Sequence, residues 1–361
     1  MDLVKWSFII PVKNGEQDLA RCIGSIRRQN LPTERYEIIV VDNGSEDKSQ
    51  QKAQELGAAV FCELTPGPAS ARNLGIEQSK GEWLVFLDVD VELAGDWIEQ
   101  SQQLLERRWI DVVQSPIIPI GPFNDPLMED FRLRYIGLKT NGKFEHLGHS
   151  RERQVQINSA AFAIKRAALK KNIRFDPQLL RCEDTDFTFQ LWLGGANFAL
   201  MSATKAWVHD RRTWWQYLWR SLRTGFWSGK VVRQWGQEGC WSMPFIGGNL
   251  LIVLNSLAVA LGTLAGAVGP TEKQKFTDSL KPDLRNLFYW VGQPGWRLNP
   301  WVRIVDLHEE LVLMHLKTGD RSILSGERAQ RLRLCLEKTD NGTLKVEEDL
   351  LPASFLIQEE S

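Results

Sequence analysis

Short apolar runs in the N-terminal part of the chain predict the strands of a parallel sheet. The runs are rich in β-branched and aromatic side chains and are bounded by turn-forming residues, as strands buried on both faces are. They cover residues 6–12, 37–42, 58–62 and 82–91. Between these runs, helices are predicted over 18–29, where apolar residues recur at helical spacing, from a cap at Ser45 to about Leu56, and over 69–79. Strands that alternate with helices in this way indicate βαβ units.

The second half of the chain continues the pattern less regularly. Further strands are predicted at 111–116, 157–164 and 205–210, with a loop-and-helix excursion over 121–153. One helix is predicted over 165–171. Another is predicted in the block 181–192, and Gly194 and Gly195 would end it. In the tail, the apolar pattern predicts helices over 302–316 and 327–336.

Composition narrows the class of protein. With 361 residues the chain can bury a large core, and 43% hydrophobic residues argue against disorder. The net charge of −1 gives no reason to expect nucleic-acid binding. Five cysteines without a Cys-x-x-Cys pair argue against a disulfide framework or a zinc site and favour a reducing compartment. No signal peptide precedes the first strand, so we expect the chain to begin in the cytosol.

Two carboxylates follow the most apolar run directly. Asp88 and Asp90 end the strand over 82–91, and ligands of open α/β sheets bind at the carboxyl ends of the strands. Carboxylates bind hard divalent cations, and such a cation can hold a diphosphate. The alternative is that both acids end the strand at a solvated turn. A dinucleotide-binding domain is disfavoured, because no Gly-x-Gly-x-x-Gly follows the strand over 6–12.

Four sequence blocks lie at 9–14, 37–47, 67–75 and 81–90. In this order they resemble the nucleotide-binding half of the family 2 glycosyltransferases, which have the GT-A fold. The resemblance is specific over about residues 5–100 and looser to about 230. It implies an α/β fold with a mostly parallel, Rossmann-like sheet flanked by helices, and a nucleotide-sugar donor as the ligand.

The resemblance also implies a role for each matched residue. Asp42 would accept hydrogen bonds from the base, and Pro11 with the residues after it would line the base and ribose. Many relatives have an aromatic residue at the position of Lys13, where it would stack on the base. In this chain Lys13 would make a cationic contact there instead. Arg72 would reach the nucleotide, the alternative being a surface salt bridge. Asp88 and Asp90, at the end of the run over 82–91, would bind the ribose and the Mn²⁺ or Mg²⁺ on the diphosphate.

The block over 181–192 resembles the Glu-Asp motif of the same family, whose aspartate is the general base. This assigns Asp184 as the base that takes the acceptor proton, with Glu183 beside it as an acceptor contact or alternate base. The alternative is that both acids only favour the start of a helix. Relatives have a glycine near 158–160, where this chain has other small residues. His209 ends a predicted strand and would complete the metal site, unless it is structural.

A tryptophan- and arginine-rich segment follows the predicted strands. Residues 211–233 suit an amphipathic helix at a membrane interface, a sugar-stacking wall or a wrapped core helix. Residues 240–270 contain no charged side chain, and 245–268 are long enough to span a bilayer. We expect membrane association, with a buried helix as the alternative and the cytoplasm or the inner face of the cell membrane as the location.

Together these observations predict a GT-A domain over 1–230, an apolar segment over 231–270 and a helical C-terminal region over 271–361. The nucleotide half would be 1–110 and the acceptor half 111–230. The predicted activity is inverting transfer of a sugar, from a UDP- rather than a GDP-linked donor, to a hydroxyl of a glycan, a lipid or another acceptor. The alternatives are a nucleotidyltransferase and a non-catalytic nucleotide-binding scaffold.

Overall fold

The structure is a computed structural model that describes residues 4–120, 158–170, 172–201, 203–211 and 213–235. Farther along it describes 258, 261–262, 264–266, 289–290, 296–298, 302–306, 310–315, 321–337, 343–344, 351 and 355–358. The predicted excursion over 121–153 lies outside these residues, as does most of the apolar segment 245–268. In the part of the chain described, no helix is long and apolar enough to cross a membrane.

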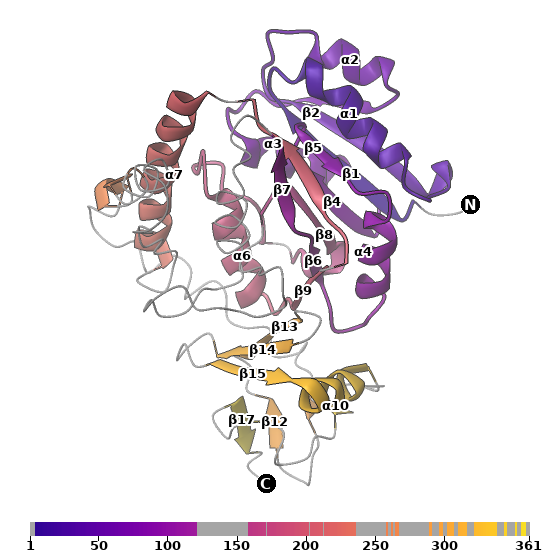
Figure 1. The fold of residues 1–361 in the computed structure, drawn as a ribbon, viewed down its shortest axis with the longest axis vertical. Coiled ribbons are helices and arrows are strands. Elements are labelled where there is room, and N and C mark those ends of the chain that lie inside the picture. The colour runs from indigo at the N-terminus through magenta and orange to yellow at the C-terminus, as the bar shows by residue number, and fades with distance from the viewer. Residues whose placement is uncertain are drawn as a thin grey trace.

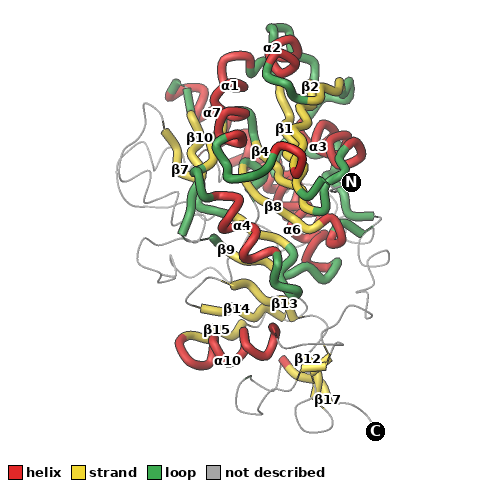
Figure 2. Tube along the Cα trace, turned by 90° about the vertical axis from the view of Figure 1, so that its right-hand side faces the viewer, coloured by secondary structure: helices red, strands yellow, loops and turns green. Residues whose placement is uncertain are grey.

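A ten-stranded sheet organises the molecule (Figures 1 and 2), in the order β15-β14-β13-β9-β6-β8-β4-β1-β2-β3. The strands β1, β2, β3 and β4 are parallel, whereas β8 is antiparallel to both β4 and β6. The N-terminal strands are β1 (Trp6–Val12), β2 (Tyr36–Asp42), β3 (Ala59–Cys62) and β4 (Trp83–Leu87). The other strands of this sheet are β6 (Val112–Gln114), β8 (Ala161–Lys165), β9 (Phe198–Leu200), β13 (Val302–Asp306), β14 (Glu310–His315) and β15 (Arg321–Ser325).

Helices cover both faces of this sheet. Successive residues of a strand point to opposite faces, so each buried strand packs against both layers of helices. On one face Phe8 and Val85 pack with α1 (Glu16–Arg27) and α4 (Trp97–Leu105). On the other face Ile9 and Phe86 pack with α3 (Pro68–Gln78) and α6 (Glu183–Leu193). The remaining helical elements are α2 (Ser49–Glu55), α7 (Trp214–Trp235), α10 (Gly326–Glu337) and the 3₁₀ turns η1 (Thr33–Arg35) and η2 (Arg166–Ala168).

Smaller sheets complete the fold. One of them joins β5 (Val91–Leu93), β10 (Ala206–His209) and β7 (Ile117–Ile120), in the order β5-β10-β7. This sheet brings the backbone of His209 next to that of Asp90, and the amide of His209 donates to the carbonyl oxygen of Asp90 at 2.9 Å. Two-stranded pairs are formed by β11 (Tyr289–Trp290) with β16 (Thr343–Leu344) and by β12 (Trp296–Leu298) with β17 (Leu356–Gln358).

The predicted α/β architecture is confirmed, whereas two local predictions are wrong. Residues 302–316 were expected to be helical, but they form β13 and β14, because β13 finds a parallel partner in β9 at the edge of the main sheet. The helix expected over 165–171 is only the turn η2. The helix predicted over 327–336 is confirmed as α10. Its neighbours β13, β14 and β15 make the C-terminal region mixed rather than helical.

Candidate active site

The candidate site lies where the parallel strands end. The register pairs Val12 of β1 with Asp42 of β2, and β4 ends directly before Asp88, so these ends share one edge of the sheet. The N-terminal halves of α3 and α6 lie at the same edge. Gly75 permits the close approach of α3, because a Cβ there would lie 2.3 Å from Cγ2 of Ile9.

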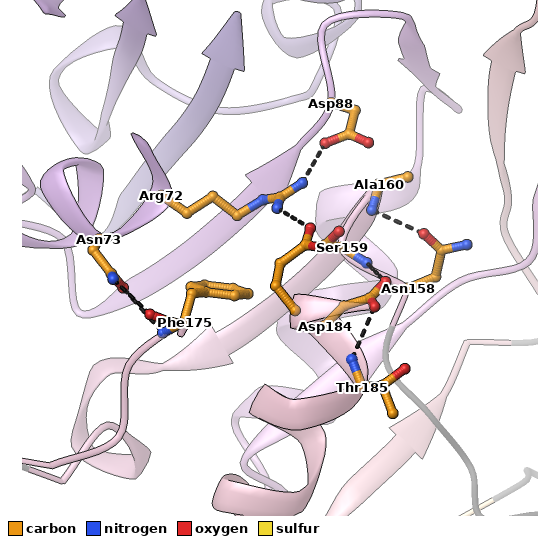
Figure 3. Close-up of polar contacts among 10 residues, drawn as sticks. Arg72, Asn73, Asp88, Asn158, Ser159, Ala160, Phe175, Asp184 and Thr185 are labelled. Carbon is orange, nitrogen blue, oxygen red and sulfur yellow. Dashed lines mark hydrogen bonds and ion pairs between the residues drawn. The ribbon is translucent and has the colours of Figure 1, made fainter. Parts of the chain in front are cut away.

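Arg72 is the central contact of the site (Figure 3). Its side chain is 2% exposed, and its guanidinium donates to Asp88 Oδ1 and to Glu183 Oε1, each at 2.7 Å. Burial alone would lower the pKa of Arg72, but the two carboxylates outweigh burial and raise it. Arg72 therefore keeps its charge and joins the end of β4 to the start of α6.

Asp184 occupies the first turn of α6, next to Glu183. Its Oδ1 accepts from the amide of Thr185 at 2.8 Å, and its Oδ2 accepts from the amide of Ser159 at 3.3 Å (Figure 3). Burial raises the pKa of Asp184 to about 7, and the negative charge of Glu183 adds to this rise. The bond from Ser159 and the charge of Arg72 oppose the rise without cancelling it. Asp184 is thus a carboxyl group poised near neutral pH.

The two acids after β4 differ in their surroundings. Asp88 is partly exposed, with one carboxylate oxygen on Arg72, and its amide donates to the carbonyl of Ala160 at 3.0 Å. Asp90 lies in the turn that leads into β5 and is also partly exposed. Oxygen donors of this kind suit Mg²⁺ or Mn²⁺, which are often held by one or two carboxylates together with substrate phosphates. The residues therefore fit a cation that arrives with a diphosphate.

The imidazole of His209 is engaged elsewhere. Its Nε2 lies 3.0 Å from Oε2 of Glu92, whose other oxygen accepts from Arg28 at 2.7 Å. Within the described ranges, no group of three or more His, Cys, Asp and Glu side chains could hold a metal. The backbone brings His209 beside Asp90, but its ring would have to leave Glu92 to join Asp88 and Asp90.

Asp42 lies in a second part of the site, at the end of β2. Its Oδ2 accepts from Nε2 of Gln50 at 2.9 Å and from the amide of Ser45 at 3.2 Å. Its Oδ1 is buried and has no hydrogen-bond partner among the residues described. A buried carboxylate oxygen without a donor is rare in native proteins, so Oδ1 is the oxygen of Asp42 whose missing donor a ligand would supply.

Pro11 and Lys13 lie on either side of Val12, the residue of β1 that pairs with Asp42. Pro11 pairs with Val41 in the sheet, and Lys13 is exposed in the loop after β1. That loop is tied to the one after β2, because the amide of Asn14 donates to Ser45 Oγ at 2.9 Å and Asn14 Oδ1 accepts from the amide of Glu46 at 2.8 Å. Ser45 was expected to cap α2, but α2 begins at Ser49 and Ser45 serves this loop instead.

The structure brings most of the predicted residues to one edge and adds contacts that sequence reasoning missed. One connected cluster contains Arg72, Asp88, Glu183 and Asp184. Asp42 lies apart from it, at the end of β2, which β1 separates from β4. The amide of Ser159 was missed, although small residues at 158–160 were noted. Glu183 and Arg72, which the sequence assigned to the acceptor and the nucleotide, are bonded to each other.

Comparison with known proteins shows which proteins this chain resembles. Residues 7–173 match the family model described as Glycosyl transferase family 2. Glycosyltransferase AglE of Haloferax volcanii is 34% identical over 113 residues, which are 30% of this chain and 37% of the relative. The poly(ribitol-phosphate) β-N-acetylglucosaminyltransferase TarS of Staphylococcus aureus is 22% identical over 214 residues, 55% of this chain and 34% of the relative.

Among solved structures, the mannosyltransferase PcManGT of Pyrobaculum calidifontis, in complex with GDP-Man and Mn²⁺, superposes with a TM-score of 0.50. It is 17% identical and the match covers 73% of each chain, which supports the fold. The chain spans little more than a third of the length of the two curated relatives above. The matched family and the observed fold show that this chain contains a glycosyltransferase family 2 domain of the GT-A type.

Proposed function

We propose that the protein transfers a sugar, with inversion, from a nucleotide-sugar donor to an acceptor hydroxyl, and that Asp184 is the general base. The observation that carries this proposal is the place of Asp184 at the strand ends, next to Glu183, which Arg72 joins to Asp88. Burial raises the pKa of Asp184 to about 7, which agrees with this role. A base is most effective when its pKa lies near the working pH. The amides of Ser159 and Thr185 hold both carboxylate oxygens, so the side chain keeps one orientation for the incoming hydroxyl.

In the proposed reaction, Asp184 takes the proton of the acceptor hydroxyl as its oxygen attacks the anomeric carbon. The bond from that carbon to the nucleoside diphosphate breaks at the same time. Asp88 and Asp90, with His209 as a further ligand, would hold a divalent cation on the diphosphate. Such a cation, when bound, stabilises the charge of the leaving diphosphate. Arg72 and Glu183 position Asp88 and the first turn of α6 relative to each other.

The free oxygen of Asp42 favours a UDP-linked donor. Uracil presents one N–H on its pairing edge, whereas guanine presents an N–H and an amino group there. Asp42 has one oxygen without a donor, since Gln50 and Ser45 occupy the other. The two parallel donors of guanine would need both carboxylate oxygens, whereas the single N–H of uracil needs only Oδ1, and guanine would therefore leave a buried polar group unpaired. Pro11 and Lys13 would line the same base and its ribose.

A donor screen followed by a base variant tests the proposal. The first step is a thermal-shift panel of UDP- and GDP-sugars, each with and without Mn²⁺, which identifies the donor. Asp184→Asn should then abolish transfer, or donor hydrolysis where no acceptor is known, while the donor Kd changes by less than about threefold. The control is Asp176→Asn, an acid in the loop before α6 that lies outside the cluster.

The outcomes separate the roles. Loss of donor affinity in Asp184→Asn, equal to the loss of turnover, would show that Asp184 binds the donor and is not the base. Donor binding by the native protein without turnover of any nucleotide sugar would make it a binding protein.

A further inference from the structure

Large apolar side chains are exposed along one face of α7. Trp215 is 78% exposed and Trp219 63%, and Phe226 is exposed as well. These residues are spaced by four and seven, so they lie on one face of the helix. Isolated exposed hydrophobic residues are normal, but a row of aromatic side chains on one helix face indicates an interaction site.

A second helical stretch extends this face. Leu261 is 62% exposed and Leu264 57%, and both lie in the helical residues 261–262 and 264–266. These residues cross α7 at very short range, because a Cβ on Gly262 would lie 2.1 Å from the carbonyl oxygen of Leu222. On Gly266 it would lie 1.8 Å from that of Phe226. The two helical stretches therefore form one surface, here called the aromatic face: Trp215, Trp219, Phe226, Leu261 and Leu264.

The aromatic face points away from the catalytic domain. The opposite side of α7 packs on the segment before the Asp184 turn, where Cys182 Sγ lies 3.6 Å from the carbonyl oxygen of Thr224 and 3.4 Å from Ser228 Oγ. Near the end of the helix, Gln234 donates to Asp186 at 3.3 Å. In Figure 1, α6 lies between α7 and the main sheet, and the second helical stretch lies on the outer side of α7.

The charged residues in the sequence of the segment 211–235 are all basic, and one of them, Arg211, pairs with Asp18 of α1 at 3.0 Å. The stretch 211–235 contains six basic residues and no acid: Arg211, Arg212, Arg220, Arg223, Lys230 and Arg233. Arg223 is exposed, and the ammonium of Lys230 lies 4.2 Å from the ring centroid of Trp227. The chain as a whole has a net charge of −1, so this excess of positive charge is local. Tryptophan and basic side chains together suit the boundary between lipid headgroups and acyl chains.

We propose that the aromatic face docks on the surface of an anionic lipid bilayer. In this arrangement α7 lies parallel to the membrane, with its aromatic side chains among the headgroups and its basic side chains on the lipid phosphates. The inference is independent of the catalytic chemistry, because none of its residues belongs to the Asp184 cluster. Its consequence is that the start of α6 lies one helix away from the lipid surface.

Vesicle flotation of the full chain tests the proposal. The probes are vesicles of phosphatidylcholine alone and of phosphatidylcholine mixed with phosphatidylglycerol. The native protein should float with the mixed vesicles and much less with the neutral ones. Trp215→Ser together with Trp219→Ser should weaken binding at least about tenfold. Arg223→Glu should weaken it at least about fivefold, and salt should reduce binding of the native protein.

The control is Leu334→Ser, which removes a leucine that is 52% exposed on α10 and should bind as the native protein does. Circular dichroism and thermal unfolding establish that each variant is folded. Binding to neither vesicle, or equal binding by the double tryptophan variant, would overturn the proposal. So would light scattering that shows a dimer that the tryptophan substitutions split, because the aromatic face would then be a contact between two copies. Donor hydrolysis measured without vesicles separates this result from a failure of the proposed activity.

Discussion

The raised pKa of Asp184 makes a specific prediction about the pH dependence of turnover. A general base acts in its ionised form, so kcat/KM should rise with pH and level off above a pKa of about 7. Measuring kcat/KM across this range with the donor found in the panel gives the value. A profile without an acid limb near 7 would contradict the assignment.

The same pKa shift affects stability in the opposite direction. The folded state holds the proton of Asp184 more tightly than the unfolded chain, whose pKa is near 3.8. Stability should therefore fall as the pH rises from about 3.8 to about 7, and this contribution is fully lost above that window. Asp184→Asn should remove this loss, so the variant should unfold at a higher urea concentration than the native protein at pH 8.

The two carboxylates on Arg72 should differ in what they contribute to stability. Glu183 is buried, so Glu183→Gln leaves the guanidinium with one charged partner fewer in a desolvated place and should cost about 1–3 kcal/mol. Asp88 is partly exposed, and solvent screens its pair with Arg72, so Asp88→Asn should cost about 0–1 kcal/mol. Urea unfolding of both variants measures the difference. Equal losses would show that the Asp88 pair is as strong as the buried one.

At the residue scale, the sequence predicted which side chains lie at the strand ends better than it predicted their hydrogen-bond partners. Asp42, Asp88 and Asp184 were recognisable because they follow apolar strands or begin a helix in a known order of motifs. The bond between Arg72 and Glu183 joins residues 111 positions apart, and no local pattern encodes that pairing. The contact of His209 with Glu92 depends likewise on β5 and β10 lying side by side.

At the scale of elements, long apolar runs gave the right strands because strands buried on both faces need no alternation. The failure at 302–316 has the same origin. Its apolar residues fit a helical spacing as well as a strand, and only the open edge of β9 decides between them. The short stretch 58–62 shows the converse, since it was predicted as a strand and forms β3 beside β2.

The packing of α3 on β1 gives a prediction about one glycine. Gly75→Ala would place a Cβ 2.3 Å from Ile9 Cγ2, so α3 must shift away from the sheet. Overpacking of this kind should cost about 1–3 kcal/mol and, because α3 carries Arg72, should also reduce turnover. Gly95→Ala is the matched control, since no atom lies within 4 Å of the new Cβ there. Urea unfolding that gives both variants the same stability would contradict this account.

At the scale of the whole molecule, the C-terminal strands belong to the same sheet as the candidate active site. β13 pairs with β9, and the side chain of Asn197 links the two regions by accepting from the amide of Ile304 at 3.2 Å while donating to the carbonyl of Trp109 at 3.0 Å. Figure 2 shows this continuity, with β9 followed by β13, β14 and β15 along one sheet. The region should therefore unfold together with the catalytic domain.

An ion pair between α10 and β13 tests that cooperativity. Arg333 of α10 binds Asp306 of β13 through two bonds of 3.0 and 2.7 Å, and Arg107 from the N-terminal half lies 3.6 Å from the same carboxylate. Arg333→Met leaves Asp306 buried with its weaker partner and should cost about 3 kcal/mol. Arg328→Met, on the exposed side of α10, should cost less than about 1 kcal/mol.

Because the sheet is continuous, Arg333→Met should move one cooperative unfolding transition to lower temperature, with activity lost in the same step. Calorimetry and residual donor hydrolysis, followed over the same temperature range, measure this. If the variant instead shows a separate early transition while hydrolysis persists, the C-terminal strands unfold on their own and the pairing of β13 with β9 does not couple them to the active site.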